Sequence, residues 1–205
     1  MTRFSSNDTG RFLGYGNNSA DLFAFRAVSD GSEVTLAVGE GLGGTASVEY
    51  QRLTAADLPT AGSIDYAGDY VSSSFEENDF DSGSGVTGDI SLTADFAAMT
   101  VTGTINNRVI VNAEGLSEIS DTMASDLTFA IGAIDSTGAF TGTLEPGATY
   151  QDGQITFNGT GSYEGLISGQ DADEAVGSVN TTWTRSDGGS SFTELGVFIL
   201  EETQP

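Results

Sequence analysis

The chain has 205 residues, of which 38% are hydrophobic, so it is long enough to bury a core as one or two globular domains. Its charge is one-sided, because 30 acidic residues stand against 6 arginines with no lysine and no histidine, for a formal net charge of −24. Nucleic acids and anionic membrane surfaces are therefore poor partners, since both are bound through clustered Lys and Arg. Such a charge favours a soluble monomer and suits a salty exterior, where screening weakens self-repulsion.

Several kinds of chemistry are missing from the residue inventory. Without Cys or His the chain has no disulfide, no Ser-His triad, no Cys-His dyad and no thiolate metal site. The remaining enzymatic hypothesis is a hydrolase that uses two carboxylates. With 30 acidic residues, however, the presence of carboxylate pairs says nothing about catalysis. We therefore predict a protein that is not an enzyme. No apolar run reaches the length of a transmembrane helix.

The N-terminal part is composed of short strands. Leu22–Val28 and Glu33–Val38 flank Asp30–Gly31, which is a hairpin signature, and Ala46–Leu53 reads as a further strand. The small, polar and Pro-containing segment Thr54–Gly62 is the best linker candidate. We therefore expect a small N-terminal β subdomain over residues 1–60 and a second domain over residues 61–205.

From Ile64 onward, apolar and polar residues alternate with period two in eight segments joined by short turns. Examples are Ile64–Tyr70, Ile90–Phe96 and Leu127–Ala133. The economical closure of such a chain is an eight-stranded antiparallel up-and-down β-barrel, because a closed barrel has no free edges. The interior of an eight-stranded barrel is either filled by side chains or holds one small ligand.

Two segments depart from this rhythm. The apolar spacing of Val109–Ser125 permits one short helix or a loop across the barrel mouth. The last strand, Phe192–Glu201, carries apolar residues on both faces, which implies cover on both sides. We predict that the N-terminal strands pack against its outer face.

An acidic hairpin stands out at Gly159–Gly177. Its first strand ends near Gly169, and the turn carries the candidate partner-binding residues Asp171, Asp173 and Glu174. The alternative interpretation of this turn is a solvated loop that protects a strand edge.

The other acidic stretch, Glu76–Gly85, is expected to be a Gly-rich loop and is a candidate metal site. Glu77, Asp79 and Asp81 offer closely spaced oxygen ligands for Ca²⁺. The match to an EF-hand loop is partial, because the final Glu and the flanking helices are missing. A disordered acidic loop without metal is the alternative.

A haem site is disfavoured, because only Tyr or Met could serve as the axial ligand. Met99 and Met123 read as gap-filling apolar residues. Tyr66, Tyr70 and Tyr163 read as barrel aromatics whose hydroxyls reach water. No cofactor is therefore expected.

Several stretches in the right order together resemble the β-barrel domain of the transferrin-binding protein B family and its single-lobe surface lipoprotein and haemophore-like relatives. The stretches are YAGDY at Tyr66–Tyr70, ADFAAMTVTGTI at Ala94–Ile105, DLTFAIGAIDSTGAFTGTL at Asp126–Leu144, YEGLISGQDADEAVGSV at Tyr163–Val179 and ELGVFIL at Glu194–Leu200. The resemblance implies an eight-stranded barrel beside a smaller β handle. It also implies export to the surface of a Gram-negative bacterium, with the leader removed, and binding of an iron carrier, haem or another partner through loops. The chain is shorter than a full pair of lobes and lacks the lipid-anchoring Cys.

The leading hypothesis is thus an exported, non-enzymatic binding protein that recognises a protein or a small solute, in uptake or at the cell surface. The alternative is a structural or adhesive surface module with a side-chain-filled barrel and no small ligand. A buried polar pocket or a coloured ligand would favour the first, and a filled barrel would favour the second or a protein partner.

Overall fold

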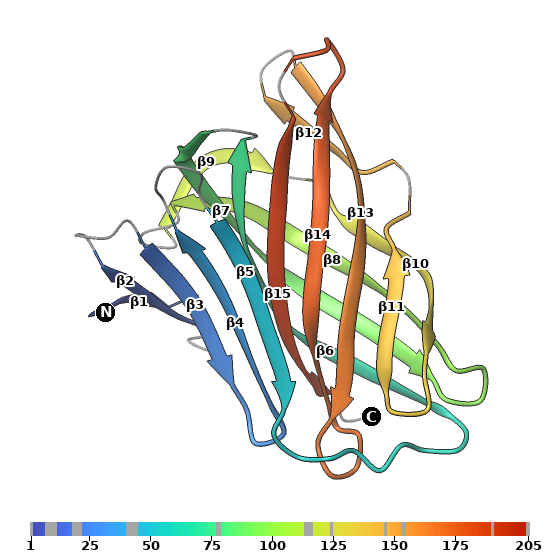
Figure 1. The fold of residues 1–205 in the computed structure, drawn as a ribbon. Coiled ribbons are helices and arrows are strands. Elements are labelled where there is room, and N and C mark those ends of the chain that lie inside the picture. Colours follow the sequence, from blue (N-terminus) through green and yellow to red (C-terminus); the bar gives the residue numbers. More distant parts are fainter. Residues whose placement is uncertain are drawn as a thin grey trace.

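The structure is a computed structural model and describes residues 2–6, 12–17, 22–39, 45–76, 79–112, 117–123, 125–145, 147–152, 155–189 and 191–203. Every regular element within these ranges is a β-strand, so the all-β prediction is confirmed. The strands form two sheets, a five-stranded one at the N-terminus and a larger one that closes into a barrel (Figure 1).

The N-terminal sheet is an antiparallel meander of five strands in sequence order. Its strands are β1 (Thr2–Ser6), β2 (Leu13–Asn17), β3 (Leu22–Val28), β4 (Ser32–Gly39) and β5 (Thr45–Arg52). As the Asp30–Gly31 signature predicts, β3 and β4 form a hairpin, in which Val28 pairs with Glu33. We call this sheet the handle.

Eight strands form the barrel, each antiparallel to its neighbours. They are β6 (Ser63–Glu76), β7 (Asp79–Asp95), β8 (Thr100–Asn112), β10 (Leu127–Ile134), β11 (Ala139–Thr143), β13 (Ile155–Ser168), β14 (Glu174–Arg185) and β15 (Phe192–Glu202). Consecutive strands pair, the last strand returns to β6, and β8 pairs with β10 across the short intervening strand. The predicted up-and-down eight-stranded barrel is confirmed.

Two short strands extend the barrel at one end (Figure 1). They are β9 (Ser117–Met123), which pairs with β8, and β12 (Thr149–Asp152), which pairs with β13. The helix or crossing loop expected over Val109–Ser125 is therefore wrong for the described residues, because β8 continues to Asn112 and β9 folds back on it. These segments form strands because each pairs with a neighbouring strand, and the spacing of apolar residues along the chain does not reveal that pairing.

The acidic loop expected over Glu76–Gly85 is also largely absent. The β6–β7 ladder continues from Ser74, opposite Ser84, to Glu76, opposite Asp79. The register shifts between these two pairs, so the ladder is irregular here. The stretch nevertheless extends the β6–β7 hairpin rather than forming a long loop, because pairing with β6 can override its poor intrinsic β-propensity.

Buried side chains form two separate cores. One fills the barrel lumen. The other lies between the handle and the barrel wall, where Phe25 and Leu36 pack with Val176, Val197 and Ile199. Figure 1 shows the handle sheet beside β15, and its strands β4 and β5 contact β15, so the predicted cover on the outer face of the last strand is confirmed.

Candidate functional site

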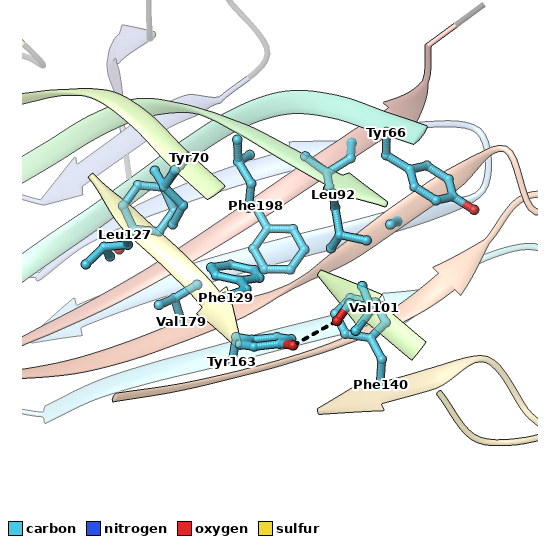
Figure 2. Packing of buried hydrophobic residues seen from close by; sticks show 14 of the residues in the cluster. Tyr66, Tyr70, Leu92, Val101, Leu127, Phe129, Phe140, Tyr163, Val179 and Phe198 are labelled. Carbon is cyan, nitrogen blue, oxygen red and sulfur yellow. Dashed lines mark hydrogen bonds between the residues drawn. The ribbon is translucent and has the colours of Figure 1, made fainter. Parts of the chain in front are cut away.

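The barrel lumen is occupied by large aromatic side chains (Figure 2). Phe129 stacks on Tyr163 with ring centroids 4.1 Å apart, and Phe140 stacks on Phe198 at 6.4 Å. Tyr163 fits because two residues of the barrel wall beside it, Gly132 and Gly142, have no side chain. A Cβ on Gly132 would come within 2.3 Å of its hydroxyl oxygen. The inward-facing side chains thus pack against one another, as in a filled barrel of this size.

The three tyrosine hydroxyls expected to reach water are instead hydrogen-bonded inside the protein. Tyr66 donates to the Ala172 carbonyl at 2.6 Å and Tyr163 to the Ala130 carbonyl at 2.6 Å. Tyr163 also lies 3.3 Å from the carbonyl of Val101 (Figure 2). The prediction of wet hydroxyls is wrong because Tyr66 and Tyr163 donate to backbone carbonyls, and Tyr70 donates to the carboxylate of Glu194. Burial raises the pKa of Tyr163 to about 12.

A buried charged cluster lies in the same lumen, centred on Glu194 of β15. Arg108 of β8 places Nη2 2.6 Å from Oε1 and 2.5 Å from Oε2 of this carboxylate. Tyr70 and Ser72 of β6 donate to Oε1 at 2.8 and 3.0 Å. Trp183 of β14 donates its indole N–H to Oε2 at 3.0 Å. We call these five residues the lumen cluster.

The lumen cluster ties together strands that are not neighbours. Glu194 is in phase with the inward-facing Phe198 and Leu200, so strand alternation directs its carboxylate into the barrel. Arg108 reaches it from β8, which pairs with β7 and β10 and not with β15. The β7–β8 ladder is irregular next to this arginine, because its register shifts between Thr87 and Asp89 of β7. On β8, Asn107 has a positive φ of 52°. Such an irregularity changes which side chains of the strand face inward.

The ion pair between Arg108 and Glu194 is almost fully buried, so each charge strongly affects the groups around it. The Arg108 and Glu194 side chains are 0% and 2% exposed. Although burial alone would raise it, the Arg108 charge and hydrogen bonds from Arg108, Tyr70 and Ser72 hold the pKa of Glu194 below its ordinary value. Burial and the Glu194 charge raise the pKa of Tyr70 well above its ordinary value. The carboxylate is therefore ionised and its tyrosine partner neutral at pH 7.

The acidic turn between β13 and β14 carries the three predicted partner-binding residues, of which one is buried and two are exposed. Glu174 is buried and accepts the Gly31 amide at 3.1 Å, Ser29 Oγ at 2.5 Å and Ser32 Oγ at 3.0 Å, all from the handle. Its carboxylate is thus used within the molecule. Asp171 and Asp173 are exposed, and binding of a partner by these two residues stays a prediction.

The calcium candidates are not brought together by anything that the structure describes. Glu77 lies outside the described residues. Asp79 and Asp81 lie in β7, and only their backbone is described. Elsewhere among the described residues, no group of three or more acids is placed to hold a metal ion. Calcium binding by Glu77, Asp79 and Asp81 therefore stays a prediction.

Sequence reasoning missed the lumen cluster, although one signal was present. Glu194 falls on the same strand face as Phe198 and Leu200, which is an unusual position for an acid. Nothing in the sequence links it to Arg108, which lies 86 residues earlier.

No helix long and apolar enough to cross a membrane occurs in the described ranges.

Comparisons with known proteins bear on this architecture. No protein-family model matches the chain, and no curated protein sequence matches it. Solved structures do. A crystal structure of the vaccine antigen transferrin-binding protein B, in a mutant form, from Haemophilus parasuis Hp5 has a TM-score of 0.57 at 14% identity, covering 94% of this chain and 38% of that chain. The chain has a transferrin-binding-protein-B-like fold.

A second crystal structure, the isotype 1 transferrin-binding protein B from serogroup B Neisseria meningitidis, agrees. Its TM-score is 0.52 at 13% identity, and the match covers 94% of this chain and 36% of that chain. The chain thus spans less than two fifths of the length of either structure. At this identity the similarity concerns the fold, and it supports at that level the resemblance predicted from the sequence.

Proposed function

We propose that this chain is an exported, non-enzymatic binding protein of a Gram-negative bacterium that recognises a protein partner through its outer surface. The observation that carries the proposal is the filled lumen. Its aromatic side chains stack on one another, and Glu194 is saturated by donors of the protein itself. The part of the lumen that the structure describes is therefore occupied by the protein's own side chains, whereas an exterior surface is open to a protein.

The charge of that surface indicates the kind of partner. The four arginines whose side chains the structure describes are each engaged within the molecule. Arg26 pairs with Glu33, Arg52 donates to the Thr137 carbonyl, Arg108 pairs with Glu194, and Arg185 pairs with Asp187. The exposed charge of the described surface is therefore dominated by carboxylates, and a partner with a basic patch would be complementary to it. Transferrin is the first candidate to test, since the two proteins of similar fold are named transferrin-binding protein B.

Native mass spectrometry of the protein from its own source, with an absorbance scan, tests whether a ligand is bound. We expect the bare polypeptide mass and no Soret band. A co-purified solute or haem would overturn the filled-lumen argument and restore uptake of a small molecule as the function.

Direct binding then tests the partner. The protein is immobilised and titrated with transferrin and with control proteins of matched size and either charge. We expect saturable binding that weakens with salt. Absence of binding to transferrin would remove that candidate. A bare protein that bound no partner from its own habitat would favour the alternative function, a structural or adhesive surface module.

A further inference from the structure

The lumen cluster has the composition of a ligand-recognition site for a carboxylate. Donors from three strands converge on one carboxylate: Arg108 from β8, Tyr70 and Ser72 from β6, and Trp183 from β14. Both oxygens receive charge-assisted bonds from the guanidinium, which is the strong form of this interaction. Such a set of donors would bind a free carboxylate in the same way as it binds Glu194.

We propose that Arg108, Tyr70, Ser72 and Trp183 form a built-in binding site for a small monocarboxylate, and that the side chain of Glu194 is its intramolecular occupant. Removing that side chain converts the lumen into a receptor for acetate- or propionate-like ions. The inference concerns the lumen alone and does not rest on the proposed function.

The donors are held in place by contacts other than Glu194, so the site should outlast its occupant. Arg108 Nη1 donates to the Ser125 carbonyl at 2.7 Å, and its guanidinium carbon lies 5.5 Å from the centre of the Trp183 ring. Trp183 is stacked on Phe192 with ring centroids 5.9 Å apart. Ser72 Oγ lies 3.3 Å from the Val86 carbonyl, which gives the hydroxyl a second acceptor.

Spare donor capacity lies in the same region. Arg108 Nε is buried and has no hydrogen-bond partner among the described residues. Thr181 Oγ1 is likewise buried and unpartnered, and Thr181 is paired with Glu194 across the β14–β15 ladder. A buried guanidinium without its carboxylate would carry an uncompensated charge, which gives a free anion a strong reason to enter.

Two variants make the test specific for ligand shape. Glu194→Gly removes a side chain that is the isostere of propionate, and Glu194→Ala removes one that is the isostere of acetate. We expect propionate to stabilise the first variant best and acetate the second. Thermal unfolding is followed by the fluorescence of Trp183, the only tryptophan in the chain. The rise in melting temperature should be saturable and reach roughly 3 °C or more at ten times the half-saturating concentration.

Matched controls separate site binding from salt effects. Wild-type protein, propionamide, and chloride at equal ionic strength should give no saturable rise. Addition of Arg108→Met to Glu194→Gly should abolish the response. A rise of equal size with chloride or propionamide, or one that survives Arg108→Met, would overturn the proposal.

If Glu194→Gly does not fold in chloride, the same ligands are present during refolding from denaturant. Recovery of the far-ultraviolet β-sheet spectrum and of the wild-type Trp183 emission with propionate, and not with propionamide, is then the expected result. Failure of every carboxylate to restore either signal would reject the site.

Discussion

The backbone N–H of Gly31 in the handle donates to the carboxylate of Glu174 in the barrel at 3.1 Å, although 143 positions separate them. The contact brings the β3–β4 turn directly against the barrel turn. A Cβ on Gly31 would come within 2.7 Å of the Gly169 amide nitrogen, so only glycine permits this approach. The handle is thus joined to the barrel by one buried carboxylate as well as by the apolar core beside it.

Glu174→Ala should loosen the attachment of the handle. The substitution leaves the Gly31 amide and the Ser32 hydroxyl buried without their acceptor, at a cost of about 2–3 kcal/mol in the free energy of unfolding. Urea denaturation measures the loss. Asp171→Ala, an exposed position in the same turn, is the control and should stay within about 0.5 kcal/mol of wild type. Equal effects of the two substitutions would argue against a docking role for Glu174.

Arg108→Met should be among the most destabilising single substitutions in the barrel. It leaves Glu194 as an uncompensated buried charge, which costs about 3–5 kcal/mol. Arg185→Met removes a partly exposed ion pair with Asp187 and should cost far less, because water screens the two charges. Denaturation of the two variants side by side measures the difference, and similar losses would contradict an energetic role for burial.

The same variant should change the pH dependence of stability. In wild type the pKa of Glu194 is lowered, so its stabilising contribution is present above the pKa of the unfolded chain and is lost as the pH falls through the folded value. Without Arg108, burial would raise that pKa, and stability would instead be lost as the pH rises through it. The difference in the free energy of unfolding between wild type and Arg108→Met should therefore become smaller as the pH falls from 7 to 4. A gap that widened on acidification would show that Glu194 is not the titrating group.

Tyr163→Phe tests the buried hydroxyl in the lumen. Loss of its bond to the Ala130 carbonyl should cost about 1 kcal/mol at neutral pH. The pKa of Tyr163 is raised to about 12 by burial, so its contribution is fully present below pH 10 and is lost between pH 10 and 12. Unfolding curves across that range should show wild type and variant converging. Parallel curves would mean that the hydroxyl does not titrate with unfolding.

Salt should stabilise the protein, because the net charge of −24 is self-repelling and the four arginines whose side chains are described are already engaged. Melting temperature measured against NaCl should rise by about 2–4 °C for each kcal/mol of repulsion that is screened. Asp171→Asn with Asp173→Asn should rise less steeply. A flat or falling curve would refute self-repulsion as a destabilising force here.

Calcium titration at matched ionic strength tests the candidate ligands Glu77, Asp79 and Asp81. Binding would raise the melting temperature beyond the NaCl curve, with half-saturation on the order of 0.1–1 mM for a surface site. The triple variant Glu77→Gln, Asp79→Asn, Asp81→Asn should lose that extra rise. Coincident calcium and sodium curves would leave the stretch without a metal role.

The pattern of residues along the chain is enough to predict the barrel. Period-two alternation fixes which side chains face inward, and the Asp30–Gly31 signature fixes the β3–β4 hairpin. Apolar residues on both faces of Phe192–Glu201 predicted the cover that the handle provides. These features are local, because strand geometry converts residue spacing directly into a face of the sheet.

The roles of the buried polar residues, by contrast, depend on contacts that form only when the chain is folded. Glu174 looked like one more surface acid, and its handle donors became visible only once the two sheets were packed together. Glu194 could be assigned to the inner face, but its pairing with Arg108 requires barrel closure and the irregular backbone at Asn107. Hydrogen bonds between side chains distant in the chain depend on which strands closure brings face to face, and no local pattern of residues encodes that choice.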